Sequence, residues 1–166
     1  MVVKGSRKQR VLFLCTQNSA RSQMAEALLR HHAGDWFEAY SAGVHAADEI
    51  HPHVERVLSE VGVSMAGQRP KPLGEYFGKV GFNYLVIVCA RAERECPVNF
   101  PGVGTRFSWI FDDPRGASVA EEDRLEKFRK VRDGIELRIL DWLDRPETEL
   151  AKLRREREVE RAERLA

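Results

Sequence analysis

A cysteine and an arginine flank a short polar loop in the segment Cys15-Thr16-Gln17-Asn18-Ser19-Ala20-Arg21-Ser22. The backbone N–H groups of such a loop, together with those at a helix N-terminus, can bind a tetrahedral oxyanion. Arg21 can close the site with two parallel hydrogen bonds to the anion. The same positive field is expected to lower the pKa of Cys15, and Ser22 can donate a hydrogen bond to the thiolate. The segment therefore predicts an activated sulfur beneath a phosphate-like ion bound by residues 16–22.

Two expected elements position this loop. Residues 11–14 form a short apolar run typical of a buried strand, and residues 23–30 are rich in good helix formers. The cysteine thus ends a strand, and the arginine begins a helix. A cysteine and an arginine at this spacing also occur by chance, so a structural cysteine before an ordinary strand-to-helix turn is the alternative.

The composition is typical of one soluble, globular domain. Of the 166 residues, 43% are hydrophobic and 32% are charged, and the formal net charge is +1. A nearly neutral chain has no general attraction to nucleic acid or to a membrane. The basic residues 1–10 precede an apolar run too short for a signal peptide, and no stretch approaches ~18 apolar residues. We therefore expect a cytoplasmic protein.

The cysteines indicate nucleophilic or redox chemistry. Three of them, Cys15, Cys89 and Cys96, are too few for a disulfide framework in a cytosolic chain. The gap between Cys89 and Cys96 is wider than that of a zinc knuckle. The histidines have no ligand-like partners in the sequence; they are His31, His32, His45, His51 and His53. We expect no metal and no cofactor.

The rest of the chain alternates strands and helices. Further strands are expected at residues 36–41, 83–89 and 105–111, and further helices at residues 52–61, 73–80 and 120–143. Residues 90–104 contain prolines and glycines and are expected to be irregular. The alternation predicts one α/β domain, residues 1–146, with a four-stranded parallel sheet and helices on both faces. The charged residues 147–166 are expected to form a solvated helical extension or tail.

Candidate functional residues follow three of the expected strands. Cys89 ends the β-branched run 83–89 as Cys15 ends the first strand, and the carboxyl ends of parallel strands share one edge of a sheet. Asp113 follows the last strand, directly before a proline. A carboxyl group there can protonate an oxygen that leaves the anion, or it can accept the proton of Cys15. The alternative is an Asp-Pro pair that only begins a turn.

Four motifs together resemble the thioredoxin-coupled arsenate reductases, which share the fold of the low-molecular-weight protein tyrosine phosphatases. The motifs are CTQNSARSQMAE at 15–26, YSAG at 40–43, the pair Cys89-x6-Cys96-Pro97, and Trp109-x-x-Asp112-Asp113-Pro114. The resemblance covers residues 10–144 and implies the phosphatase-type anion-binding loop after the first strand. The cysteine pair favours a reductase, because a phosphatase needs no second and third thiol.

The resemblance implies that the chain reduces arsenate to arsenite through a relay of thiols. Arg21 binds the anion, Cys15 attacks arsenic and Asp113 protonates the departing oxygen. Cys89 then attacks Cys15, Cys96 attacks Cys89, and thioredoxin reduces the last disulfide. A disulfide spans only about 5.5–6 Å between Cα atoms, so residues 90–104 must move. Phosphate or sulfate would compete with arsenate, and a monomer is expected.

Two positions in the loop, and the two residues that follow Asp113-Pro114, depart from the family pattern. Gln17 stands where glycine is usual, which would be costly if that position requires a positive φ. Ala20 replaces a cysteine that does not belong to the relay. Arg115 and the glycine after it stand where the phosphatases carry aromatic residues. The chain therefore lacks the aromatic side chains against which the phenol ring of a substrate would pack. This favours a small inorganic oxyanion.

A further departure concerns a potassium site of the family beside the loop. The residues matching it are Asn18, Glu26 and Ser41, and the family's aspartate aligns near Lys71. The lysine ammonium is therefore expected to replace the ion. Two alternative functions remain open from the sequence: a phosphatase that does not depend on Cys89, and a non-catalytic protein that senses an oxyanion.

Overall fold

The computed structural model describes residues 7–116, 120–145 and 148–165. Four strands form one parallel sheet in the order β2-β1-β3-β4. They are β1 (Gln9–Cys15), β2 (Phe37–Gly43), β3 (Phe82–Ile87) and β4 (Val103–Ser108). The predicted α/β class and four-stranded parallel sheet are thus confirmed, although β3 and β4 each begin and end earlier in the chain than expected.

Five α-helices and one 3-10 turn accompany these strands in the described residues. They are α1 (Arg21–Ala33), α2 (Pro52–Ser59), η1 (Leu73–Glu75), α3 (Ala90–Glu95), α4 (Glu121–Leu143) and α5 (Glu149–Leu165). The helix expected at 73–80 is only the turn η1. Residues 90–95 were expected to be irregular, and this was wrong. They are good helix formers, Arg91 pairs with Glu95 at i,i+4, and the first proline comes only after Cys96.

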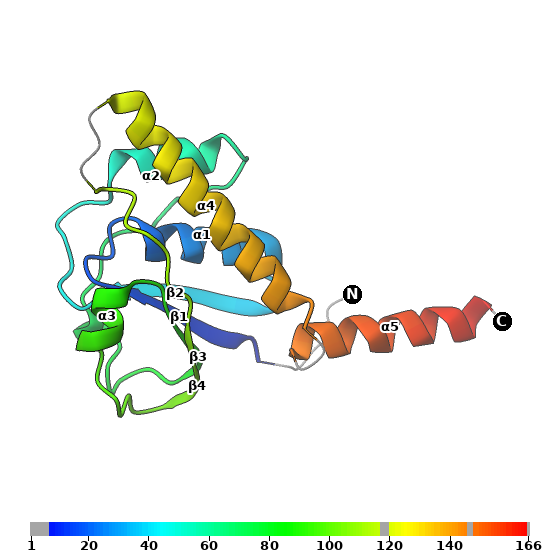
Figure 1. The fold of residues 1–166 in the computed structure, drawn as a ribbon. Helices are drawn as coiled ribbons and strands as arrows, with labels where there is room; N and C mark the ends of the chain where they lie inside the picture. Colours follow the sequence, from blue (N-terminus) through cyan, green and yellow to red (C-terminus); the bar gives the residue numbers. More distant parts are fainter. Residues whose placement is uncertain (1–6, 117–119, 146–147, 166) are drawn as a thin grey trace.

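Secondary structure covers both faces of the sheet, as predicted. Helices α1 and α4 pack together on one face (Figure 1), where Phe37 of β2 contacts Trp142 of α4. Tyr40, three residues along β2, points to the opposite face and contacts Tyr76 at the end of η1. The β3–α3–β4 connection crosses the sheet in the opposite direction to β1–α1–β2. Right-handed crossovers therefore place α3 on the face away from α1.

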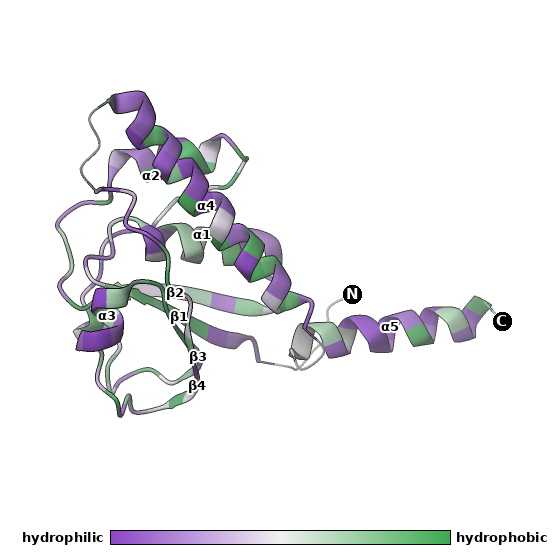
Figure 2. Ribbon diagram, in the orientation of Figure 1, coloured by the Kyte–Doolittle hydropathy of each residue, from purple (hydrophilic) through white to green (hydrophobic). Residues whose placement is uncertain are grey.

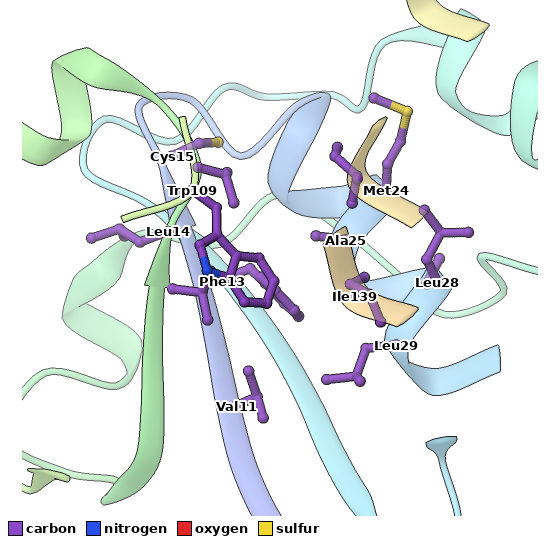
Figure 3. Close-up of a cluster of buried hydrophobic side chains, with 14 of the residues drawn as sticks. Val11, Phe13, Leu14, Cys15, Met24, Ala25, Leu28, Leu29, Trp109 and Ile139 are labelled. Atoms are coloured by element: carbon purple, nitrogen blue, oxygen red, sulfur yellow. The ribbon is translucent and has the colours of Figure 1, made fainter. Parts of the chain in front are cut away.

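The two central strands are buried on both sides. Residues 11–14 of β1 and residues 85–88, from β3 onward, have no exposed surface. Figure 3 shows buried side chains of β1, α1 and α4 in one cluster with Trp109, which lies below Cys15 in this view and packs against Phe13. Because β1 is buried from residue 11 to its end at Cys15, the loop that follows it starts from a fixed point.

The last helix lies apart from this core. Figure 1 shows α5 extending away from the sheet, and Figure 2 shows it as mostly hydrophilic. Its residues from Arg154 to Leu165 are exposed. One contact with the core is the guanidinium of Arg157, which lies 4.8 Å from the ring centre of Trp36. Among the described helices, none has both the length and the apolar character needed to cross a bilayer.

Candidate active site

The loop after β1 turns its carbonyl groups outward. Four carbonyl oxygens accept hydrogen bonds of 2.7–3.0 Å from backbone N–H groups of residues 44–51. The four acceptors are Cys15, Thr16, Gln17 and Ser19. The loop N–H groups therefore point inward, where that of Asn18 donates to the Cys15 sulfur at 3.1 Å. This arrangement is an oxyanion nest.

The N-terminus of α1 completes the nest. Helix α1 begins at Arg21, and its N-cap residue Ala20 has no side-chain acceptor for the first N–H groups. These groups are therefore available to an anion. The Arg21 side chain is buried; its Nη1 donates to the Phe111 carbonyl oxygen at 3.0 Å. Arg21 thus connects the loop to the segment after β4.

Gly43 allows the loop to lie against β2. It is opposite Cys15 in the register of the two strands. A Cβ atom at this position would lie 2.8 Å from the Thr16 carbonyl oxygen and 2.9 Å from the Asn18 nitrogen. Because both are backbone atoms, any side chain would displace the loop. In the sequence Gly43 is only the end of the YSAG motif, because its role follows from the strand register.

Asn18 fixes the shape of the loop. Its φ of 51° makes it the only non-glycine residue with a positive φ in the described residues, and asparagine tolerates this conformation. Its side chain donates to Ser22 Oγ at 2.8 Å and accepts from Gln23 Nε2 and the Lys71 N–H, both at 2.9 Å. Gln17 is not the left-handed position, so the backbone cost considered for it does not arise.

Gln23 is a supporting residue that the sequence analysis missed. Its amide nitrogen donates to both oxygens of Asn18 and to the Arg69 carbonyl oxygen at 2.9–3.0 Å. Its own side-chain oxygen accepts from Gln68 at 2.7 Å. These bonds tie the loop to residues 68–69. No sequence signal shows this beyond the position of Gln23 inside the loop motif.

The Cys15 thiol is buried and hydrogen-bonded. Its sulfur lies 2.8 Å from Ser22 Oγ and accepts from the Asn18 N–H. Burial raises the pKa of Cys15, whereas the Ser22 and Asn18 hydrogen bonds lower it, and the charge of Cys89 raises it. Burial is the largest of these influences, so the expected lowering of the Cys15 pKa was wrong. A thiol in this state reacts more readily when a nearby group accepts its proton.

Asp113 lies beside the anion loop as a carboxylate held by two arginines. Its carboxylate receives two hydrogen bonds from the Arg115 guanidinium, at 2.9 Å from Nε and 2.8 Å from Nη2. Arg21 Nη2 lies 3.5 Å from Oδ2 of the same carboxylate. Burial alone would raise the pKa of Asp113, but the two guanidinium groups lower it to about 2. Asp113 is therefore a carboxylate at neutral pH, which suits the proton-accepting role.

The titration of Asp113 is a direct test of this arrangement. Because its pKa is lowered, its ion pairs stabilise the folded chain above the unfolded pKa of ~3.9. This stabilisation is lost as the pH falls through about 2. We expect a carboxyl carbon NMR titration to give a midpoint of about 2 for Asp113, and a higher midpoint in Arg115→Ala. A midpoint near ~4 in the unaltered chain would contradict the geometry.

The structure brings Cys89 to the edge of the sheet that carries Cys15. The Cys89 sulfur lies 3.3 Å from Thr16 Oγ1, within the anion loop. Cys89 is also the N-cap of α3, where its sulfur accepts from the Ala92 N–H at 3.4 Å. Cys96 is the C-cap of the same helix. All three thiols are free and buried.

Helix α3 separates the second and third cysteines. Cys89 and Cys96 are seven residues apart, and a helical rise of ~1.5 Å per residue places their Cα atoms ~10 Å apart. A disulfide requires about 4.4–6.8 Å. These two sulfurs therefore cannot bond while α3 is wound. The pKa of Cys96 is raised by burial, against the lowering effect of Arg106.

A buried lysine lies behind the loop. Lys71 Nζ is 3.6 Å from Glu26 Oε2 and 3.5 Å from Ser41 Oγ, and it donates to the Arg69 carbonyl oxygen at 2.8 Å. Burial lowers the pKa of Lys71, whereas Glu26 raises it. The ammonium lies among the oxygens that the family resemblance assigned to potassium, so this donor set does not fit an additional alkali-metal ion. In the described residues, no cluster of histidine, cysteine and carboxylate side chains could hold a metal.

This sheet, with a cysteine-to-arginine anion loop after its first strand, defines a phosphatase-type α/β protein. The sequence profile of the low molecular weight phosphotyrosine protein phosphatases matches residues 10–159, and the chain belongs to this family. Within it, the chain is 37% identical over 133 residues to the arsenate reductase of Shouchella clausii. That alignment covers 80% of this chain and 93% of the relative.

Solved structures show the same similarity. An arsenate reductase in the phosphate binding state matches with a TM-score of 0.65 and 27% identity, over 81% of this chain and 96% of that one. The thioredoxin-dependent arsenate reductase of Corynebacterium glutamicum matches with a TM-score of 0.55 and 34% identity, over 81% of this chain and 65% of that one. The resemblance predicted from the motifs is confirmed.

Proposed function

We propose that the protein reduces arsenate to arsenite with three cysteines, and that thioredoxin regenerates it. The observation that carries the proposal is the 3.3 Å contact between the Cys89 sulfur and Thr16 of the anion loop. A hydrolase of this fold has no use for a second thiol at that place. The names of the relatives, arsenate reductase and thioredoxin-dependent arsenate reductase, support the same function.

The first step joins arsenic to sulfur. The loop N–H groups and Arg21 bind arsenate, and the Cys15 sulfur attacks arsenic from below. Asp113 accepts the Cys15 proton and transfers it to the oxygen that leaves arsenic as water. The pKa of Asp113, about 2, keeps it a carboxylate at neutral pH, and such a weak base readily gives the proton up to the departing oxygen. The product is a Cys15–arsenic adduct in which arsenic is still pentavalent.

The second step reduces arsenic. The Cys89 thiolate attacks the Cys15 sulfur, and a Cys15–Cys89 disulfide forms. The electron pair of the sulfur–arsenic bond passes to arsenic, which leaves as arsenite. The two sulfurs have together lost two electrons, and arsenic has gained them. The 3.3 Å distance between the Cys89 sulfur and Thr16 Oγ1 supports this attack.

The third step moves the disulfide outward. Cys96 attacks Cys89, and Cys15 is released as a thiol. Because α3 separates Cys89 and Cys96, this helix must unwind for the new bond to form. Thioredoxin then reduces the Cys89–Cys96 disulfide through a mixed disulfide. The relay suits a monomer in the reducing cytoplasm, where structural disulfides are rare.

A coupled assay tests this function. Arsenate, thioredoxin, thioredoxin reductase and NADPH are mixed with the protein, and NADPH oxidation and arsenite are followed together. We expect one arsenite for each NADPH consumed, with phosphate or sulfate as competitive inhibitors. Hydrolysis of an aryl phosphate without any arsenite would instead indicate the phosphatase, and phosphate binding with neither activity would indicate the sensor.

A further inference from the structure

Arg115 lies across the mouth of the anion loop. Its Nη1 donates to Ser19 Oγ at 3.0 Å and also contacts the side-chain oxygen of Gln17. Its Nε and Nη2 bind the Asp113 carboxylate, and its backbone N–H donates to the same carboxylate at 3.0 Å. One guanidinium therefore connects the loop to the residue expected to handle the proton.

Two departures from the family pattern meet in this contact. Gln17 stands in place of a glycine and Arg115 in place of an aromatic residue, and nothing in the sequence links the two. In the structure the Gln17 side chain accepts a hydrogen bond from Arg115. A glycine at position 17 would offer no such acceptor. The two residues thus form a single unit over the loop.

The guanidinium carries a positive charge beside the anion loop. The Arg115 side chain is only 24% exposed. Its pKa is raised first by the hydrogen bonds that it donates to Asp113, and the charges of Cys15 and Cys89 raise it further. Arg115 therefore remains a cation, and it lies within electrostatic reach of both thiols. An oxyanion seated on Cys15 would experience the same positive charge.

The geometry of attack decides which part of the anion meets Arg115. In an in-line displacement the leaving oxygen lies opposite the attacking sulfur, on the side of Asp113. In free arsenate or phosphate this oxygen carries only a proton or a charge, and it can accept a hydrogen bond from a guanidinium. In a phosphate monoester the same oxygen carries carbon. The substituent would have to pass through the space that Arg115 occupies between Asp113 and Ser19.

We propose that Arg115, anchored by Gln17 and Ser19, is a specificity-determining residue that binds the leaving oxygen of a free tetrahedral oxyanion and closes the mouth of the loop against organic monoesters. The inference deepens the proposed function and rests on it for the identity of the oxyanion. It assigns to this chain a second anion-binding arginine in addition to Arg21.

Substitutions at position 115 test the proposal by binding and by two reactions. Phosphate affinity is measured by titration calorimetry, and kcat and KM are measured for arsenate reduction and for p-nitrophenyl phosphate hydrolysis. We expect Arg115→Ala to weaken phosphate binding and to raise the KM for arsenate about 10- to 100-fold, as for the loss of a hydrogen bond to a charged group. The ratio of ester hydrolysis to arsenate reduction, each as kcat/KM, should rise at least about tenfold.

Three further variants separate this role from a structural one. Arg115→Lys retains the positive charge but loses the planar set of guanidinium donors. It should therefore recover part of the phosphate affinity that Arg115→Ala loses. Gln17→Gly removes an anchor and should change the ratio in the same direction by a smaller factor. Arg145→Ala, which breaks an exposed pair with Asp141 at the other end of α4, serves as the matched control. Thermal unfolding of each variant identifies any loss of folding.

An unchanged phosphate affinity together with an unchanged activity ratio in Arg115→Ala and Arg115→Lys would overturn the inference. Phosphate binding and ester hydrolysis require neither Cys89 nor Cys96, so they report on Arg115 independently of the relay. If the unaltered chain made no arsenite while Arg115→Ala still changed phosphate affinity and ester hydrolysis, the proposed function would fail and the role of Arg115 would stand.

Discussion

A Cys96→Ser variant given arsenate without thioredoxin is expected to release a single arsenite per chain and then stop, whereas Cys89→Ser is expected to release none. In Cys96→Ser the attack of Cys89 on Cys15 still frees arsenite, and the Cys15–Cys89 disulfide remains. In Cys89→Ser the adduct on Cys15 has no sulfur beside the loop to attack it, because α3 keeps Cys96 at a distance. Rapid-quench arsenite measurement and mass spectrometry of the alkylated chain distinguish the two results.

Both variants serve as their own folding controls. Hydrolysis of an aryl phosphate needs neither Cys89 nor Cys96, so the rate of the unaltered chain, however much Arg115 restricts it, should persist in Cys89→Ser and Cys96→Ser. It should disappear, together with arsenite release, in Cys15→Ser. Sustained turnover of Cys96→Ser with thioredoxin would contradict the three-cysteine relay and would indicate a two-cysteine route with another thiol donor.

A Lys71→Met variant is expected to lose about 3–5 kcal/mol of unfolding free energy, as when one partner of a buried ion pair is removed. The side chains of Lys71 and Glu26 are 8% and 9% exposed, so the Glu26 charge would remain buried without its cation. Urea unfolding measures the loss. The same variant should become dependent on potassium, because a cation can then occupy the space between Glu26 and Ser41.

The matched control is Lys71→Met combined with Glu26→Gln, which removes both charges and should recover a large part of the lost stability. In the unaltered chain we propose that the ammonium performs the structural task of the ion, so equal concentrations of potassium and sodium should support equal arsenate reduction. A several-fold advantage of potassium in the unaltered chain would show that this replacement is wrong.

The central sheet could be predicted from the sequence because its two middle strands are buried on both sides. A strand in that position is apolar at every residue, as at 11–14. It therefore appears in the sequence as a short, uninterrupted run of apolar residues. The loop was predictable for a related reason, since Cys15 ends such a strand and Arg21 begins a helix. The polar residues between them have few other structural explanations.

Other features depend on contacts between distant residues and could not be predicted in this way. The role of Gly43 follows from its register with Cys15, which no sequence pattern shows. Lys71 lies beside Glu26 and Ser41, where only the family resemblance led us to expect it. The pKa of Cys15 was misjudged because its burial is a property of the packed core. Helix α3 was a different error, since its helix-forming residues were weighed together with the prolines that come later in 90–104.

The backbone bonds that join the anion loop to residues 44–51 also determine which part of the molecule can change without harm. Anion binding depends on the loop that these bonds hold in place. The sulfurs of Cys89 and Cys96, in contrast, lie at the two ends of α3, a helix of six residues. We expect that residues 89–104, transplanted into a hydrolase of the same fold, would add the second and third thiols. The anion loop of that hydrolase would remain intact. The difference between hydrolysis and reduction would then lie in residues 89–104, and the anion loop would serve both reactions.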